Sequence, residues 1–359
     1  MPRFEDNILG LVPKQEWLDV GNNLVINHPG DPTDELIGDI HTDNLVAYWE
    51  SLAAEYNIPL MAQFHGFDTE AQTTFRAPID THNVEKGLIK VKINQSERMR
   101  ALLRSGVQNE DLYDYVINDG IRLADQVIMR SKVAKNELMA TGKVTIKENN
   151  LDLTVDYGVP QAQTGLTLDF GPGASAPVDE QLEAIVSAAL AKGVTINGIM
   201  LSRAMLNKLR KADVIQRAIN GNAMAGVLVS NADLRAYLNE EYGIGDIKVN
   251  DSTYGVPGPV VNGRPTVVQK RLFPVDKVTF YGATNGKLGD GLWGDAPESD
   301  VAQLMDAKGS SESPFVTISQ WVEKDPAVLW TKASALFMPA LYNPNSLFIA
   351  TATNTPAEG

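Results

Sequence analysis

Residues 109–141, NEDLYDYVINDGIRLADQVIMRSKVAKNELMAT, form the longest helical pattern of the chain and decide how the rest can fold. Asn109 predicts the start of this helix because its side chain can accept hydrogen bonds from free backbone amides, and Gly142 predicts its end. At about 1.5 Å per residue the helix would be roughly 50 Å long, well beyond the ~30 Å width of a small compact domain. The pattern therefore predicts a flat, elongated subunit.

One face of this helix is predicted to pack against a core. Apolar residues recur at spacings of three, four or seven, as expected for a single buried stripe. They are Leu112, Val116, Gly120, Leu123, Val127, Ala134 and Leu138. The opposite face is expected to be solvated, with Asp114, Asp125, Arg130, Lys132 and Lys135.

The composition is that of a folded protein without cysteine. Of the 359 residues, 43% are hydrophobic and 21% are charged, which allows two modest cores or one core with large excursions. The absence of cysteine excludes a disulfide framework, a thiolate nucleophile and a cysteine-ligated zinc site. The opening MPRFEDNILG is not a signal peptide, and no apolar run approaches the ~20 residues of a membrane span. We expect a soluble protein, made in the cytoplasm, with no membrane partner.

Charge is distributed unevenly along the chain. The net charge of −14 argues against binding nucleic acid over a broad face, because phosphate affinity depends on clustered Lys and Arg. Residues 1–57 hold two bases against eleven acids, a balance of −9, whereas residues 83–104 hold six bases against two acids, a balance of +4. We expect these segments to meet across subunits, so that salt weakens assembly.

The first segment is predicted to be an acidic arm that ends in a short helix. Prolines at positions 13, 29 and 32 favour an extended chain over the first forty residues. Asp43 can cap a helix from Leu45 to Tyr56 in which four apolar residues share one face. They are Leu45, Tyr48, Trp49 and Leu52.

Residues 59–93 alternate between short strands and turns, which predicts a long β-hairpin. Its expected strands are 60–64, 72–75 and 88–93. In the last of these, Ile89, Val91 and Ile93 share one face, and Leu88, Lys90 and Lys92 share the other. An isolated hairpin cannot bury this apolar surface, so the hairpin requires a partner surface.

After the long helix, residues 144–157 predict a plain hairpin, and residues 165 to about 308 predict a mixed α/β domain inserted into the fold. The expected strands of that domain are 166–170, 195–201, 247–249, 266–268 and 277–281, and its expected helices are 178–191, 203–219 and 231–242. The tail is predicted to be strand-like again, with strands at 315–322, 327–337 and 347–353.

Three short motifs suggest chemistry, but each has a simpler interpretation. Gly38-Asp39-Ile40-His41 resembles a metal-binding turn of the metallophosphoesterases, although the rest of such a site is missing and solvated arm residues explain it better. The turn 171–176 has dinucleotide-binding glycine spacing, but Pro172 and the lack of a ribose-binding acid favour a structural turn. The segment 282–288 resembles a phosphate-binding loop that is one residue too short. We predict no catalytic residue, no cofactor-binding residue, no metal site and no enzyme activity.

The order of these parts resembles the major capsid proteins of tailed bacteriophages with the Hong Kong 97-type fold, and among them the phage lambda E-type family. Four stretches carry the resemblance. They are TTFRAPIDTHNVEKGLIKVKINQSE (73–97), VAKNELMATGKVTI (133–146), GATNGKLGDGLWGDAPESD (282–300) and the close VEKDPAVLW (322–330) with FMPALYNPNSLFIATAT (337–353). None of these stretches is a catalytic motif.

The resemblance implies an α+β fold with five parts. Residues 1–57 would be an N-terminal arm, 58–97 an extended β-hairpin loop that reaches a neighbouring subunit, and 98–165 a peripheral domain containing the spine helix. Residues 166–308 would be an inserted axial domain around five- and six-fold axes. Residues 309–359 would return to the peripheral domain.

The resemblance also implies a function, that of a major capsid or head protein. Hexamers and pentamers would assemble into an icosahedral shell enclosing phage DNA, so the protein would be synthesised in the host cytoplasm and reside in the virion. The chain has no long helical leader, which implies a separate scaffolding protein. A portal protein is a further expected partner, and a decoration protein is left open. Packaged DNA is expected to lie against the wall without specific binding.

Five residues are expected to make assembly contacts between subunits. They are Lys86, Lys90, Lys92, Arg98 and Trp49. A basic run over 130–147 could touch phosphate, but a solvated helix end is the simpler interpretation. Two alternative functions stay open at this point: an encapsulin-like cellular nanocompartment shell, and a small-molecule α/β enzyme that uses the Gly171 turn.

Overall fold

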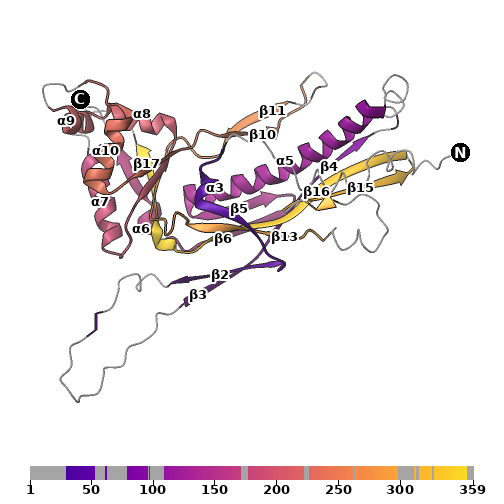
Figure 1. Cartoon of the computed structure of the whole chain (residues 1–359), viewed down its shortest axis with the longest axis horizontal. Helices are drawn as coiled ribbons and strands as arrows, with labels where there is room; N and C mark the ends of the chain where they lie inside the picture. Colours follow the sequence, from indigo (N-terminus) through magenta and orange to yellow (C-terminus); the bar gives the residue numbers. More distant parts are fainter. Residues whose placement is uncertain are drawn as a thin grey trace, which may run out of the picture.

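The molecule is elongated and consists of two lobes (Figure 1). The spine lobe contains the long helix α5 (Asn109–Thr141) and a six-stranded sheet, and the α/β lobe contains a five-stranded sheet with four helices. The computed structural model describes residues 30–52, 61–62, 79–95, 97, 109–170, 177–221, 226–261, 264, 266–297, 311–312, 315–325 and 327–353.

The predicted long helix is confirmed at both ends, since α5 spans Asn109–Thr141. It ends because Gly142 adopts a left-handed conformation, with φ of 71°, and its amide donates to the Leu138 carbonyl at 2.8 Å. Leu123, Val127 and Leu138 are buried, as the apolar stripe requires. Residues 109–118 belong to the helix, but their side chains lie outside the described part of the chain.

The sheet of the spine lobe is built around β16 (Ala327–Leu341). Its strand order is β1-β13-β16-β15-β14, and β4 also pairs with β16. The strands are β1 Ile37–His41, β4 Gly87–Gln95, β13 Gly289–Gly294, β14 Ser311–Glu312 and β15 Thr317–Lys324. Helix α5 packs along this sheet, and its apolar stripe shares one core with Ala333 and Ala335 of β16 (Figure 1).

The α/β lobe has a mixed sheet of order β7-β17-β12-β8-β9, in which β12 is antiparallel to both neighbours and the two outer pairs are parallel. Its strands are β7 Leu166–Asp169, β8 Gly198–Leu201, β9 Asp246–Val249, β12 Lys277–Tyr281 and β17 Leu347–Thr353. Its helices are α7 Val178–Leu190, α8 Arg203–Lys211, α9 Asp213–Asn220 and α10 Asn231–Tyr242. This lobe has its own core, so the predicted alternation of strands and helices does form a unit. The helix expected over 203–219 is divided at Ala212, which is extended.

Among the described residues, three two-stranded ribbons and three short helical turns complete the fold. The ribbons are β2 (Val46–Leu52) with β3 (Ile79–Glu85), β5 (Lys143–Glu148) with β6 (Leu151–Asp156), and β10 (Thr253–Pro257) with β11 (Val267–Arg271). The turns are α3 (Thr33–Leu36), α6 (Gln161–Thr164) and η3 (Pro344–Ser346). The β5–β6 ribbon confirms the hairpin predicted after the long helix.

The helix predicted from Leu45 to Tyr56 is wrong, because this segment forms strand β2 and pairs with β3. Burial follows a period of two: Ala47 and Trp49 are buried, whereas Val46 and Tyr48 are exposed. The same residues also fit a helical spacing, so the local pattern could not decide between the two structures. Pairing with a strand some thirty residues away decides it.

The strands predicted to form a hairpin over residues 59–93 do not pair with one another in the described part of this segment. Strand β3 pairs with β2, and β4 pairs with β16. Strand β4 leaves the ribbon and joins the central sheet, where Val91 lies opposite Ala333 of β16. The predicted division of its two faces is confirmed for Ile89 and Val91, which pack on the core, and for Lys90 and Lys92, which are exposed. Ile93, predicted to share the face of Ile89 and Val91, is exposed. The other strands expected for this hairpin, 60–64 and 72–75, fall largely outside the described residues.

Two segments lie in the opposite lobe from the one expected. Strand β13 belongs to the sheet of the spine lobe although it precedes residue 308, and strand β17 belongs to the sheet of the α/β lobe although it follows residue 309. The chain therefore crosses between the lobes more often than a single insertion would require. Each crossing strand pairs on both sides in the sheet that it joins, one strand in from the edge.

A close backbone contact between β13 and β16 leads to our first prediction. A Cβ atom on Gly289 would lie 1.8 Å from the Ala340 carbonyl oxygen, which cannot move without disturbing the ladder. We expect Gly289→Ala to lower the free energy of unfolding by about 3 kcal/mol, as overpacking does. Urea denaturation followed by circular dichroism measures this change.

Gly87→Ala is the matched control, because Gly87 begins β4 in the same sheet. Its Cβ atom would meet only the Ile146 side chain, at 3.4 Å, and the Phe337 carbonyl oxygen, at 3.6 Å. We expect little change for this variant. Equal losses of stability for the two variants would contradict the steric argument.

Candidate assembly site

The acidic segment before β1 is held against α5 by a buried polar network. Asp31 accepts from the Thr33 amide at 3.1 Å, from Asn136 of α5 at 2.6 Å and from Asn250 at 2.9 Å. The Asn136 side-chain oxygen also accepts from Thr33 and from Asn250, each at 2.8 Å. Asn250 directly follows β9, so these contacts join the acidic segment to both lobes.

Next to this network, two lysines of α5 hold two further acids. Lys135 lies 3.0 Å from Asp34 and 2.8 Å from Asp39, and its side chain is completely buried. Lys132 lies 2.9 Å from the other oxygen of Asp34. Asp39 also accepts from the indole nitrogen of Trp293 on β13 at 2.7 Å. We call Lys132, Lys135, Asp34 and Asp39 the lysine clamp.

The clamp corrects two predictions. Lys132 and Lys135 do not lie on a solvated helix face, because residues 31–41 cover that side of α5. Asp39 is exposed, as predicted, but it lies in strand β1 and pairs with Lys135, so it does not belong to a free arm. The basic run 130–147 therefore does not offer these two lysines to a phosphate.

The pKa values of two acids of this segment are shifted in opposite directions. Burial raises the pKa of Asp31 above its ordinary value, although hydrogen bonds from Thr33 and Asn136 counteract this. Burial acts in the same direction on Asp34, but Lys135 and Lys132 outweigh it and hold the pKa of Asp34 below its ordinary value. Asp34 is therefore the carboxylate whose charge the fold stabilises.

The clamp needs a glycine beneath it. A Cβ atom on Gly291 of β13 would lie 2.6 Å from the Asp39 carboxylate and 3.0 Å from Cε of Lys135. Any other residue at this position would therefore displace the ion pair. The stretch GDGLWG, which forms β13, thus supplies both the space for the clamp at Gly291 and the indole donor Trp293.

Two of the residues predicted to contact neighbouring subunits are used inside this one. The Lys86 ammonium is buried and donates to the carbonyl of Thr42 at 2.8 Å, to its hydroxyl at 2.6 Å and to the carbonyl of Trp293 at 3.0 Å. Burial lowers the pKa of Lys86, and Asp295 and Asp43 counteract this. Trp49 is only 5% exposed, because it stacks between His82 and Tyr157. Neither side chain is available to a partner in this conformation.

Lys90 and Lys92 are exposed, as predicted, on the face of the sheet that turns away from α5. The Lys92 ammonium lies 4.2 Å from the ring centre of Trp330, which stacks on Trp321 at 6.2 Å. Lys332 lies over Trp321 at 5.8 Å. We call Lys90, Lys92, Lys332, Trp330 and Trp321 the lysine–tryptophan face. Arg98 lies outside the described residues.

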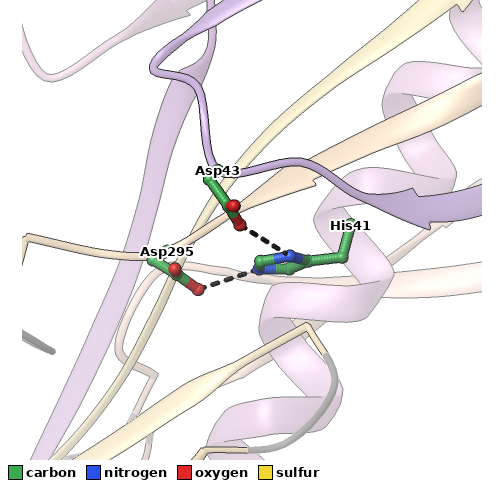
Figure 2. Close-up of side chains that lie close together, drawn as sticks. All are labelled: His41, Asp43 and Asp295. Atoms are coloured by element: carbon green, nitrogen blue, oxygen red, sulfur yellow. Dashed lines mark hydrogen bonds and ion pairs between the residues drawn. The ribbon is translucent and has the colours of Figure 1, made fainter.

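The motif Gly38-Asp39-Ile40-His41 does not form a metal site. The Asp39 carboxylate already contacts the Lys135 ammonium and the Trp293 indole nitrogen. His41 instead lies between two other carboxylates (Figure 2). Its Nε2 atom is 2.8 Å from Asp295, and its Nδ1 atom is 3.5 Å from Asp43. All three residues are exposed and could approach a common cation, but each ring nitrogen already faces its own carboxylate.

Several acids of the arm are thus engaged within the subunit. Asp31, Asp34 and Asp39 contact α5 or β13, Glu35 pairs with Lys248 and Asp43 faces His41. The expectation that the arm keeps its charge for a neighbour does not hold for Asp31, Asp34 and Asp39, whereas the side chains of Glu35 and Asp43 stay largely exposed. The Gly171 turn lies outside the described residues. Among the described helices, none is both long enough and apolar enough to span a membrane.

Comparison with solved structures identifies the fold. A structure described as the capsid protein of a prophage of Escherichia coli CFT073 is 10% identical and superposes with a TM-score of 0.54, covering 95% of this chain and 99% of that one. A phage-related protein from Bordetella bronchiseptica RB50 is 11% identical, with a TM-score of 0.51 and coverage of 95% and 97%. No curated protein matches the sequence. The chain therefore shares the overall fold of these two proteins.

The sequence then identifies the family, because residues 68–352 match the family described as phage major capsid protein E. The match covers most of the chain, and the chain belongs to this family. It is accordingly an α+β capsid protein of a tailed bacteriophage that self-assembles into the icosahedral shell enclosing phage DNA. The encapsulin-like alternative is not favoured.

The lysine clamp predicts a large effect of one substitution. Lys135→Met removes the buried ammonium and leaves Asp34 and Asp39 without their shared partner. We expect a loss of about 3 kcal/mol of unfolding free energy, the low end for a broken buried pair, because the two carboxylates stay about a third exposed. Urea denaturation at pH 7 measures it.

Lys143→Met is the matched control, because Lys143 follows the same helix and pairs with Asp156 at 2.7 Å. Both of these side chains are about half exposed. Exposed pairs contribute little, so we expect a loss below about 1 kcal/mol. A Lys135→Met variant as stable as this control would show that the clamp is dispensable for folding.

The lowered pKa of Asp34 predicts a dependence on pH. Its ionised form contributes stability above the unfolded value of 3.8, and this contribution disappears as the pH falls through the lower folded pKa. Asp34→Asn should therefore reduce the urea midpoint clearly at pH 7 and progressively less as the pH falls below 3.8. Asp152→Asn is the control, since Asp152 is exposed and lies 3.9 Å from Lys147. A constant difference between wild type and Asp34→Asn from pH 7 to pH 3 would contradict the assignment.

Proposed function

We propose that the subunit forms hexamers and pentamers in which the α/β lobe acts as the axial domain and the spine lobe as the peripheral domain. Family membership and the elongated two-lobed architecture support this division. The axial part would be residues 166–281 together with β17, and the peripheral part would be α5 with the six-stranded sheet. This assignment modifies the boundaries at 308 and 309 to follow the strand pairing.

The β2–β3 ribbon is proposed as the base of the extended loop that reaches a neighbouring subunit. It projects away from both lobes (Figure 1). Val46 and Tyr48 on one of its faces are exposed, although an isolated two-stranded ribbon is at best marginally stable in water. A second copy of the chain would supply the missing cover.

The lysine–tryptophan face is proposed as the surface that receives this loop. The paired strands of the ribbon carry three acids, Glu50, Asp80 and Glu85, and no base. The receiving face offers three lysines beside two stacked indoles, a combination that suits an acidic partner with apolar residues. Lys90 and Lys92 are the assembly residues retained from the sequence prediction.

The remaining partners are proposed from family membership. They are a separate scaffolding protein, a portal protein and, as an open possibility, a decoration protein. The protein would be synthesised in the host cytoplasm and then become part of the virion, as a structural subunit without enzyme activity. Packaged DNA would lie against the shell without sequence-specific contacts, which agrees with a net charge of −14.

Negative-stain electron microscopy of the purified chain tests the proposal. We expect closed shells or capsomer-like rings at low salt, with or without a co-expressed scaffold. The combined substitution Lys90→Glu and Lys92→Glu should prevent assembly, because it places acids opposite the acidic ribbon. The variant should keep the circular dichroism spectrum of the wild type, since both side chains are exposed.

Lys147→Glu controls for charge reversal as such, because Lys147 is exposed on the β5–β6 ribbon. This variant should assemble as the wild type does. Assembly of the Lys90→Glu and Lys92→Glu variant to the same extent would overturn the proposed receiving face. A wild-type chain that stays monomeric at high concentration with scaffold present would overturn the proposed assembly.

A further inference from the structure

A cavity in the α/β lobe is lined by three arginines. It has a volume of about 220 Å³ and lies between α8, α10 and β9. Arg203 and Arg210 come from α8 and Arg235 from α10, and Leu206, Asn207, Asn231 and Val249 complete the wall. Among the described residues that line it, none is acidic. This concentration of positive charge is unexpected in a chain with a net charge of −14.

Only one of the three arginines has an acidic partner. The Arg203 Nε atom lies 3.1 Å from Asp251, which Arg271 also contacts. Arg210 donates to the Val229 carbonyl at 2.7 Å and, more weakly, to the side-chain oxygen of Asn207 at 3.4 Å. Arg235 donates only to the Ile247 carbonyl, at 3.4 Å. These acceptors are neutral, so two positive charges at the cavity have no counter-charge from the described residues.

The bonds that Arg210 and Arg235 make also leave most of their donors unused. A guanidinium has five N–H donors in a fixed planar fork, and the oxygen atoms of a phosphate match that fork. The bond to Val229 holds Arg210 in place, which reduces the entropy that a ligand would have to remove. Asn207 and Asn231 add amide groups that can donate to the same oxygens.

We propose that this cavity binds a phosphate group. A phosphate monoester carries a charge of about −1.5 to −2 at neutral pH, which compensates both unpaired guanidiniums, whereas a single carboxylate compensates only one. The volume corresponds to several water molecules at about 30 Å³ each, so a phosphate with a neighbouring group fits. The site is separate from the lysine clamp and from the lysine–tryptophan face, and the proposal does not depend on how subunits assemble.

The phosphate has two possible sources with the same chemistry. One is a small free anion with linked phosphates, and the other is the backbone of the packaged DNA. A backbone phosphate carries no sequence information, so contact with it agrees with the absence of specific DNA recognition. One phosphate per subunit would be a weak contact that becomes significant only when many subunits line one surface.

Calorimetric titration of the unassembled full-length protein with sodium pyrophosphate tests the site, at ionic strength held constant with sodium chloride. We expect saturable binding at one site per chain. Arg235→Gln should weaken binding about tenfold or more, the effect of losing one charge-assisted hydrogen bond. Arg235 is exposed and its one protein contact is long, so this variant should keep its fold. Arg210→Gln should have a similar effect on binding.

Lys270→Gln is the matched control, since it removes one exposed positive charge from β11, outside the cavity. It should bind pyrophosphate as the wild type does. An equal loss in the control and in Arg235→Gln would show unspecific charge attraction and overturn the site. Absence of saturable binding of the wild type to both pyrophosphate and a DNA duplex would also overturn it.

A parallel titration with a short DNA duplex distinguishes the two sources. DNA binding that Arg235→Gln weakens and Lys270→Gln does not would support the site and identify the DNA backbone as its ligand. Pyrophosphate binding that depends on Arg235, with DNA binding that does not, would support the site and identify a small free anion. If the protein binds DNA but not pyrophosphate, and Arg235→Gln does not weaken the DNA binding, the proposal is overturned.

Discussion

The fold of the spine lobe depends on one buried charge, the ammonium of Lys135. A lysine without access to water needs carboxylates close by, because burying an unpaired charge costs several kcal/mol. Asp34 and Asp39 supply them, and they come from a segment about one hundred residues earlier in the chain. The segment is consequently held along α5, and its strand β1 becomes the edge of the six-stranded sheet.

The clamp also selects one register for β1. Strand β1 runs parallel to β13 with Asp39 opposite Gly291, and only a residue without a Cβ atom leaves room for the ion pair at that place. A shift by one residue would move Asp39 to the other face of the strand, away from Lys135 and from Trp293. Apolar residues of similar volume could stabilise this contact as well, but they would not specify the register so strictly.

The sequence predicted the parts of the fold that local patterns determine. Both ends of α5, the bounds of α10 and β12, and the two faces of β4 follow from capping residues and periodicity, and they were predicted correctly. The capsid family was also predicted, because each of the four stretches that carry the resemblance is an unbroken run of residues that can be read directly from the sequence. Segment 45–56 was predicted wrongly as a helix. Its apolar residues fit the spacing of a helix as well as the alternation of a strand, and only pairing with β3 decides between the two structures.

The candidate site could be predicted only in part, because it combines residues from distant segments. Lys90 and Lys92 were correctly placed on an exposed face, whereas Lys86 and Trp49 were not recognised as buried. One signal could have indicated the clamp: Lys132, Lys135, Asn136 and Met139 recur at spacings of three and four, and they form a second buried stripe of α5. Hydrophobic spacing does not indicate this stripe, because three of its four residues are polar.

The location of the arm's acids changes the electrostatics of assembly. Asp31, Asp34 and Asp39 are held within the subunit, so the exposed acids in the described part of this region are Glu35, Asp43 and those of the β2–β3 ribbon. Buried pairs are screened by salt much less than exposed ones. Salt should therefore separate subunits, whose contacts depend on exposed charges, at concentrations that leave the lysine clamp and the subunit fold intact. The same chain can thus combine a salt-resistant fold with a salt-sensitive assembly, because it places its charge pairs at different depths.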